Sequence, residues 1–348
     1  MARTRGAGGP LLELTRARWL EFAREPEAIF WVFVFPVLLA GGLGLAFRNR
    51  AAESLKIGVA DRVGAEAIAA ALEDAPGLAP DVLGEGEALE ALRTGKLALV
   101  VIPGDSTTYL FDPTRNDGRL ARLKVDDAIQ RAAGRTDPQL VRDHQLDQPG
   151  SRYIDFLIPG LLGMNLMGSG MWGIGFNLVQ TRRRKLLKRY LATPMRKSHF
   201  LASFVLSRLL FMVLEVAALV GFGWLVFGVQ VRGSMINLLI VSVIGALAFA
   251  GLGLLTASRA QTIEGISGLM NFVMMPMWIF SGVFFSYTNF PESMQPFIQA
   301  LPLTPLNDAL RSIMLDGAPL GENLARLAAI SAWGGLSFLA ALKLFRWS

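Results

Sequence analysis

Two ionisable residues stand close together inside an otherwise apolar stretch of this 348-residue chain. Arg208 and Glu215 are seven residues apart within 201–227, and in an α-helix this spacing leaves their backbones about 10 Å apart on nearly the same face. Charged groups in a hydrophobic span are costly, so Glu215 is a candidate functional residue. The alternative is a structural glutamate that neighbouring Ser, Asn or backbone groups satisfy.

A strongly basic segment precedes that stretch. Thr181–Phe200 holds eight Lys or Arg and no Asp or Glu. Apolar residues recur in it at the spacing of one helix face, at Leu186-Leu187 and Tyr190-Leu191. A new helix can begin favourably at Thr193-Pro194. We therefore expect a surface on which a partner acts. The residues selected for this role are Arg182, Arg183, Arg184, Lys185, Leu187, Arg189, Leu191, Thr193 and Pro194.

Composition indicates a membrane protein. Hydrophobic residues make up 52% of the chain and charged residues 18%, whereas about a quarter of the residues are charged in soluble domains. The net charge of +6 would suit nucleic acid, but the basic residues flank apolar runs, so the lipid bilayer is the expected partner. The chain has no Cys, and His144 and His199 are far apart, which argues against thiol chemistry and a metal site. It also lacks the Gly-x-x-x-x-Gly-Lys-Ser/Thr loop, so we expect no catalytic residues and no cofactor of its own.

The apolar runs predict a polytopic α-helical membrane protein with six spans, each near the length of about 20 residues that crosses a bilayer. Sixteen Lys or Arg flank the spans on one side and three on the other, which places both termini in the cytoplasm. Residues 1–28 contain four Glu and fit an amphipathic helix on the inner surface better than a signal peptide. The predicted spans are 29–47, 154–179, 201–227, 235–257, 266–286 and 324–345, and 180–200 is a cytoplasmic segment.

Two outer segments carry structure of their own. Residues 48–153 alternate predicted strands with helices, which indicates a small α/β domain. The strands are predicted at 55–61, 81–83, 97–102 and 107–111, and the helices at 64–74, 86–94 and 117–133. Such a domain could bind substrate, bind an accessory protein or form a cap, and we favour the last two over catalysis. Residues 287–323 predict short helices, near 291–300 and 304–315, that lie in the outer interface or form a re-entrant pair.

Polar and methionine side chains mark the second and fifth spans. Asn165 and Met167 stand in one, and Asn271 and Met274 in the other. Adaptable Met surfaces suit a pathway for varied apolar groups, so these four residues and Glu215 are candidates for its lining. The alternative is ordinary packing by Met and interhelical hydrogen bonding by Asn.

Three stretches resemble one family, the ABC-2 type permeases, which are transmembrane subunits of ABC exporters. They are Arg24–Trp31 before a Pro36-containing span, Leu186–Leu201, which is similar to the coupling helix of that family, and Ser281–Phe285 with Leu301–Thr304 and Asp308–Arg311. The resemblance covers essentially the full chain. Many members have acidic residues and a Gly before the coupling helix, whereas this chain has Thr181–Lys185, so its docking surface would be unusually basic.

The resemblance implies a bacterial inner-membrane exporter of apolar or amphiphilic cargo. It further implies a dimer with a second copy or sister chain, and separate ABC ATPase subunits that bind ATP and Mg and push on the coupling segment. The first and fifth spans would pack near the dimer axis, the second and fifth would line the route, and a periplasmic accessory protein could join. Two alternatives remain: an ion-coupled secondary transporter, and a membrane sensor or assembly protein that transports nothing.

Overall fold

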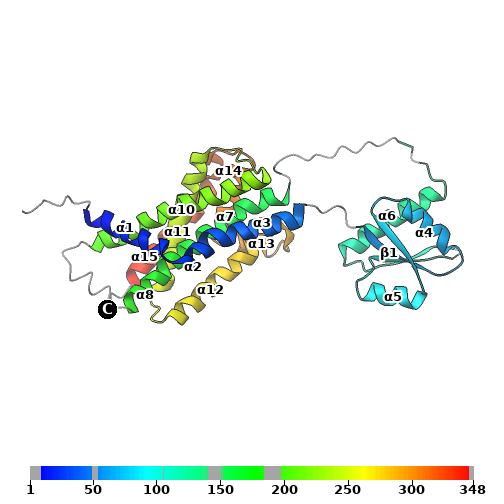
Figure 1. Cartoon of the computed structure of the whole chain (residues 1–348), viewed down its shortest axis with the longest axis horizontal. Coiled ribbons are helices and arrows are strands. Elements are labelled where there is room, and N and C mark those ends of the chain that lie inside the picture. The colour runs from blue at the N-terminus through cyan, green and yellow to red at the C-terminus, as the bar shows by residue number, and fades with distance from the viewer. Residues whose placement is uncertain are drawn as a thin grey trace, which may run out of the picture. The chain divides into compact units, whose positions relative to one another are not determined.

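The protein is described here by a computed structural model. The structure describes residues 9–48, 54–104, 106–136, 138–139, 150, 152–183 and 197–344. The chain forms two compact units, one from residues 1–48 and 146–348 and the other from 49–145 (Figure 1). The first unit is helical and the second contains a sheet, as the sequence predicts.

Six helical stretches within the described residues are long and apolar enough to cross a membrane. Each overlaps one predicted span, and the expected polytopic helical fold is confirmed. The second stretch continues to Arg183, past the predicted end at Val179, whereas the fifth ends at Phe280, before the predicted Ser286. The six stretches are Pro26–Phe47, Tyr153–Arg183, Leu206–Phe227, Met235–Ala257, Ile263–Phe280 and Leu320–Leu344.

Two of these stretches contain a wide π-helical turn. The first consists of α2 (Pro26–Ile29), the π-helix η1 (Phe30–Val34) and α3 (Phe35–Arg48). The second consists of α7 (Tyr153–Met171), the π-helix η2 (Trp172–Phe176) and α8 (Asn177–Arg183). Single π-helical turns are frequent at functional sites. The remaining long helices are α10 (Lys197–Phe227), α11 (Met235–Ala257), α12 (Ile263–Phe280) and α15 (Leu324–Leu344), the last preceded by η4 (Leu320–Asn323).

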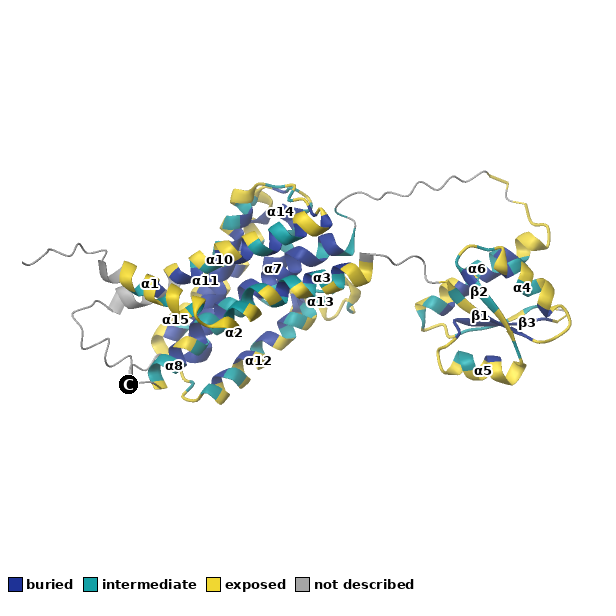
Figure 2. Cartoon of the chain, in the orientation of Figure 1, coloured by how far each residue is buried: buried dark blue, intermediate teal, exposed yellow. Residues whose placement is uncertain are grey.

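Helix α7 lies at the centre of the helical unit, and α11 packs directly against it (Figure 2). Small residues allow this close approach. A Cβ on Gly253 would lie 2.9 Å from the Cα of Met171, and a Cβ on Gly251 would lie 2.7 Å from the carbonyl oxygen of Gly334 on α15. Since apolar surface is not expelled from a lipid environment, such close backbone packing is what holds membrane helices together.

The segment after α12 forms short helices, as predicted. They are η3 (Tyr287–Asn289), α13 (Gln295–Ala300) and α14 (Leu303–Met314). Most residues of α14 are buried, and it packs against α7, α11 and α15. This helix is therefore part of the core of the helical unit.

The second unit is an α/β fold with a four-stranded sheet in the order β2-β1-β3-β4. Strand β1 is parallel to β2 and β3, and β4 is antiparallel to β3. The expected class is confirmed, although β2 begins at Leu78, three residues before the predicted strand. The strands are β1 (Leu55–Ala60), β2 (Leu78–Leu83), β3 (Leu99–Ile102) and β4 (Thr108–Leu110), and the helices are α4 (Ala65–Glu73), α5 (Glu85–Arg93) and α6 (Asn116–Ala132).

Helices cover both faces of this sheet. Ile57 and Leu99 belong to the core formed with α4 and α6, whereas Val100 packs with Ala88 of α5 on the other face (Figure 2). Alternate strand residues point to opposite faces, so β3 supplies both cores.

Candidate functional site

Arg208, Glu215 and Ser169 form a charge cluster inside the helical unit. The Nη1 of Arg208 lies 2.9 Å from Glu215 Oε1, and its Nη2 lies 3.2 Å from Oε2. Only 5% of the Arg208 side chain and 1% of the Glu215 side chain are exposed. The two residues face each other across two turns of α10, as their spacing allows. The contact is a bidentate ion pair, the strongest hydrogen-bonded form of this interaction.

Ser169 joins this pair to α7. Its hydroxyl lies 3.0 Å from Glu215 Oε2 and 2.6 Å from the Nη2 of Arg208, and it donates to the carbonyl oxygen of Asn165. Arg208 Nη2 also lies 3.4 Å from the Leu166 carbonyl oxygen. The Nε of Arg208 is buried and has no hydrogen-bond partner among the described residues. The cluster therefore holds α10 against α7, and the Nε of Arg208 is a buried donor that these contacts do not satisfy.

Asn165 links α7 to the first span. Its Nδ2 donates to the carbonyl oxygen of Val32, at 3.1 Å, inside the π-helix η1. A π-helical turn displaces backbone carbonyls from the regular helical pattern, so such a carbonyl is available to a side chain. The first span, α7 and α10 are thus joined through polar contacts around Asn165 and Ser169.

The structure brings together some of the predicted pathway residues. Asn165 lies one turn from Ser169 and so belongs beside the charge cluster. Met167 and Met274 are buried in the core, and the Cε of Met274 approaches Gly168 of α7. Asn271 is different, because it lies on the exposed face of α12 with Phe272 and Met275.

Only the beginning of the predicted partner surface is described. The Nη1 of Arg182 donates to the carbonyl oxygens of Ala257, at 3.4 Å, and Ala260, at 3.1 Å, so this side chain holds the end of α8 against the end of α11. Arg183 is exposed. The other selected residues, Arg184, Lys185, Leu187, Arg189, Leu191, Thr193 and Pro194, lie outside the described residues.

The N-terminal helix α1 (Gly9–Ala23) packs against α10 (Figure 1). Trp19 stacks on Phe211 with ring centroids 5.1 Å apart, and Phe22 lies 4.2 Å from the same ring. The Nε of Arg18 donates to Ser203 Oγ at 3.1 Å. The sequence predicts an amphipathic helix on the membrane surface, and in the structure the aromatic residues of this helix contact the helix that carries the charge cluster.

Arg311 is a structural centre whose role the sequence did not reveal. The sequence places it in a predicted short outer helix but shows none of its partners. Its Nε donates to the Phe156 carbonyl oxygen at 3.3 Å, its Nη2 donates to the Gly282 carbonyl oxygen, and its guanidinium lies 3.7 Å above the Phe156 ring. Asn307 Nδ2 donates to the Ser281 carbonyl oxygen at 2.8 Å. Helix α14 thus holds the turn after α12 and the start of α7.

Burial changes the ionisation of this outer cluster. It lowers the pKa of Arg311 to about 10, an effect that the nearby Asp308 carboxylate and Tyr287 partly oppose. Burial likewise raises the pKa of Asp308, against the opposing effect of the charges on Arg311 and Arg326 and a hydrogen bond from Tyr287. Each buried group therefore holds its charge less readily than it would in water.

These features define a polytopic membrane protein. Within its described residues it has six helices that can span a membrane, a polar cluster between α7 and α10, and a separate α/β unit inserted after the first span. Comparison with known families assigns its class: the model of the ABC-2 family transporter proteins matches residues 26–343. The chain belongs to this family.

Individual relatives match shorter parts. The chain is 29% identical to ABC transporter G family member 20 of Dictyostelium discoideum over 56% of this chain and 27% of that protein. It is 28% identical to the inner membrane transport permease YadH of Escherichia coli over 44% of this chain and 59% of that protein. It is 32% identical to nodulation protein J of Bradyrhizobium diazoefficiens over 29% of this chain and 38% of that protein. The chain thus spans less than two thirds of the length of each relative.

Proposed function

We propose that this chain is the membrane-spanning permease subunit of an ATP-driven ABC exporter in the bacterial inner membrane, with both termini in the cytoplasm. Its membership of the ABC-2 family and its similarity to a protein named an inner membrane transport permease support this function. ATP and Mg would be bound by separate ABC ATPase subunits that act on residues 180–200.

The observation that carries this proposal is the course of α10. This helix runs without interruption from Lys197 to Phe227, about 46 Å at 1.5 Å per residue. It begins within the last four residues of the basic segment and carries both charges of the charge cluster. Force applied to the segment would therefore reach the buried contact with α7 through one rigid element. The residues from Arg182 to Pro194 selected above would form the surface that receives this force.

The route for cargo would lie beside α7 and α12. Our candidates for its lining are Asn165 and Met167 on α7, Asn271 and Met274 on α12, and Glu215 of α10, which contacts Ser169 of α7. Within the described spans, charged side chains are few, which favours an apolar or amphiphilic cargo. Movement of α10 would change the contacts of Glu215 with Ser169 and would bring the Nε of Arg208, which has no hydrogen-bond partner among the described residues, toward a polar neighbour.

A second permease copy, or a sister chain, would pack against the first and fifth spans. Both spans expose large apolar side chains: Trp31 and Leu38 on one, and Phe272 and Met275 on the other, each more than half exposed. The outer α/β unit would act as a cap or bind a periplasmic accessory protein.

The test is stimulation of the partner. The chain and a cognate ABC ATPase are co-purified, reconstituted in lipid vesicles, and assayed for ATP hydrolysis. We expect the basic surface to dock on an acidic groove of the ATPase. The double variant Arg183→Glu and Arg184→Glu should therefore reduce both co-purification and the permease-dependent part of ATP hydrolysis, because charge reversal opposes this docking. Arg182 is left unchanged, since it holds α8 against α11.

The matched control is Arg119→Glu, which reverses an exposed charge on α6 of the outer unit and should leave both readouts unchanged. Unaltered co-purification and hydrolysis in the double variant would contradict docking through this surface. Cargo movement that follows an ion gradient without ATP would instead support a secondary transporter.

A further inference from the structure

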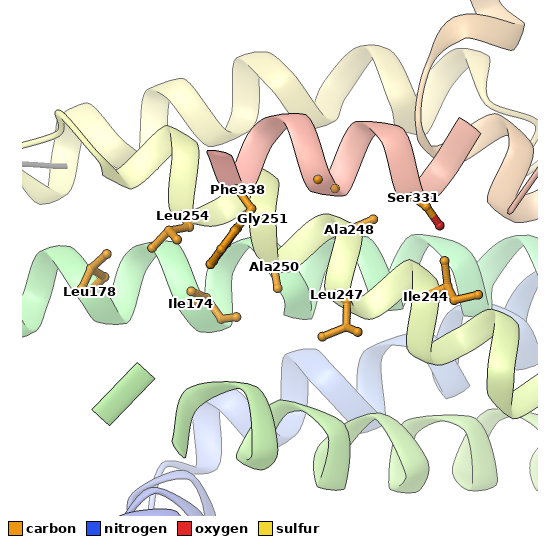
Figure 3. A pocket seen from close by; sticks show the side chains of 12 residues that line it. Ile174, Leu178, Ile244, Leu247, Ala248, Ala250, Gly251, Leu254, Ser331 and Phe338 are labelled. Carbon is orange, nitrogen blue, oxygen red and sulfur yellow. The ribbon is translucent and has the colours of Figure 1, made fainter. Parts of the chain in front are cut away.

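A groove with a volume of about 400 Å³ lies on the side of the helical unit, between the second span, α11 and α15 (Figure 3). Small buried residues, Ala250, Gly251 and Gly334, form its floor, and exposed Leu247 and Phe338 border it. Among the described residues that line it, only Ser331 has a polar side chain. Its surroundings are the spans of a membrane protein, so this groove opens toward hydrocarbon.

The length of the groove along the helices matches the thickness of one leaflet of the bilayer. It follows α11 from Ile244 to Leu254, which is about 15 Å of helix. This is about half of the hydrocarbon core, which is about 30 Å thick. One end of the groove is at Leu178 and Leu254, within about one turn of the point where Arg182 binds the Ala257 carbonyl oxygen.

That end of the bundle is basic, and we call it the basic end. Arg183, Arg259 and Lys343 are exposed there, together with the half-buried Arg182. The described parts of α8, α11 and α15, and the residues 258–262, contain no Asp or Glu. The next acidic residue along the chain after Arg259 is Glu264, on α12. An apolar groove that ends at several cations matches a molecule with an apolar chain and an anionic head.

We propose that this groove binds an anionic phospholipid, with one acyl chain between α11 and α15 and the headgroup phosphate at the basic end. A bilayer supplies such a ligand at this depth, and basic pockets between membrane helices are suited to anionic headgroups. The lipid would fill the space between three spans and stabilise their packing. The inference does not depend on ATP-driven transport, since it concerns the bilayer alone.

The experiment measures retained lipid. The full-length chain is reconstituted in a bilayer with equal amounts of phosphatidylglycerol and phosphatidylcholine that have the same acyl chains, then extracted into detergent and examined by native mass spectrometry. Phosphatidylglycerol should be retained in excess. The variants Arg259→Gln and Lys343→Gln, which each remove one positive charge, should each reduce this excess roughly fivefold. The reason is that one basic side chain contributes about 1 kcal/mol to the attraction of anionic lipid near a membrane surface.

Two matched variants test the groove itself. Gly335 lines the groove, and a Cβ added to it would have no neighbouring atom within 4 Å, so Gly335→Leu should fill the groove and remove the retained lipid. Gly221→Leu makes the same change on α10, also where nothing lies within 4 Å, and should retain it. Ser331→Leu obstructs the groove from another turn of α15 and replaces Gly335→Leu if that variant does not fold.

Any one of the following results would overturn the proposal. The first is retention of the two lipids in the ratio of the bilayer. The second is undiminished retention of phosphatidylglycerol in a folded groove-filling variant. The third is a loss of phosphatidylglycerol in Gly221→Leu that equals the loss in the groove-filling variants. If both groove-filling variants misfold, the charge variants decide, and an unchanged excess of phosphatidylglycerol then refutes the site. Displacement of the signal by inorganic phosphate alone would indicate a free anion site and would also refute it.

Discussion

The charge cluster permits a quantitative test, because its two charges are buried and depend on each other. Glu215→Leu leaves the Arg208 guanidinium buried without a counter-charge, and Arg208→Met does the same to the Glu215 carboxylate. Removing one partner of a buried pair costs about 3–5 kcal/mol. Replacing both by apolar residues is often close to neutral, so the double variant Arg208→Met with Glu215→Leu should be more stable than either single variant.

The assay is thermal unfolding in detergent, followed by the fluorescence of the chain's seven tryptophans. On the entropy scale of globular proteins, about 3–5 kcal/mol corresponds to a fall of about 4–7 °C in the Tm of a chain of this length. Glu264→Gln is the control, since Glu264 is exposed on α12 and its neutralisation should leave the Tm unchanged. If the double variant loses as much as the two single variants combined, the residues are not coupled and the cluster is not the contact that holds α10 to α7.

Other sites give further tests. Burial raises the Asp308 pKa, so as the pH falls the native protein binds a proton at Asp308 before the unfolded chain does. Acidification through this pKa should therefore increase the free energy of unfolding. A series of melts at different pH should show this increase in the unchanged chain and not in Asp308→Asn. Arg311→Lys should lower the free energy of unfolding by about 1–3 kcal/mol, because an ammonium group cannot reproduce the contacts with both the Phe156 and the Gly282 carbonyl oxygens. A melting curve identical to that of the unchanged chain would contradict a stabilising role of these contacts. Gly253→Ala should lower the Tm because its Cβ would meet Met171, whereas Gly268→Ala, in open space, should not. The fragment 49–145 should fold alone, and Leu99→Ala should lower its free energy of unfolding in urea by about 2–5 kcal/mol; an unchanged midpoint would show that Leu99 is not in its core.

The sequence predicted the elements of both units for identifiable physical reasons. Apolar runs near the length of a bilayer core can form only helices in a membrane, since every backbone polar group must be satisfied internally. In the outer unit, Leu99, Val100 and Val101 form an apolar run that is covered on both faces, as strands of a parallel sheet require. The seven-residue spacing of Arg208 and Glu215 indicated a possible contact because both lie on one helix.

Contacts between helices were not predictable in the same way. The bond from Asn165 to the Val32 carbonyl oxygen depends on a π-helical turn, which has no simple pattern of residue types. Arg311 lies among backbone carbonyls of residues more than 25 positions away, so the predicted helix that contains it showed none of these partners. In both cases the partner is a backbone oxygen, which every residue possesses and no residue type reveals.

The deeper reason is that lipid and protein interior have nearly the same polarity. A soluble helix shows its buried side by an apolar stripe, but a membrane helix is apolar on every side, so hydrophobicity does not identify the face that packs. Helix α12 illustrates this point: Phe272, which is 78% exposed, and Met274, which is 1% exposed, are similarly apolar. Size marks some contacts but not the whole interior: Gly253 and Gly334 lie where backbones touch, whereas Gly221 and Gly268 lie in open space and the bulky Phe249 is fully buried. In such a chain, paired polar groups such as Arg208 and Glu215 indicate the interior, and neither the hydrophobicity nor the size of a residue does so alone.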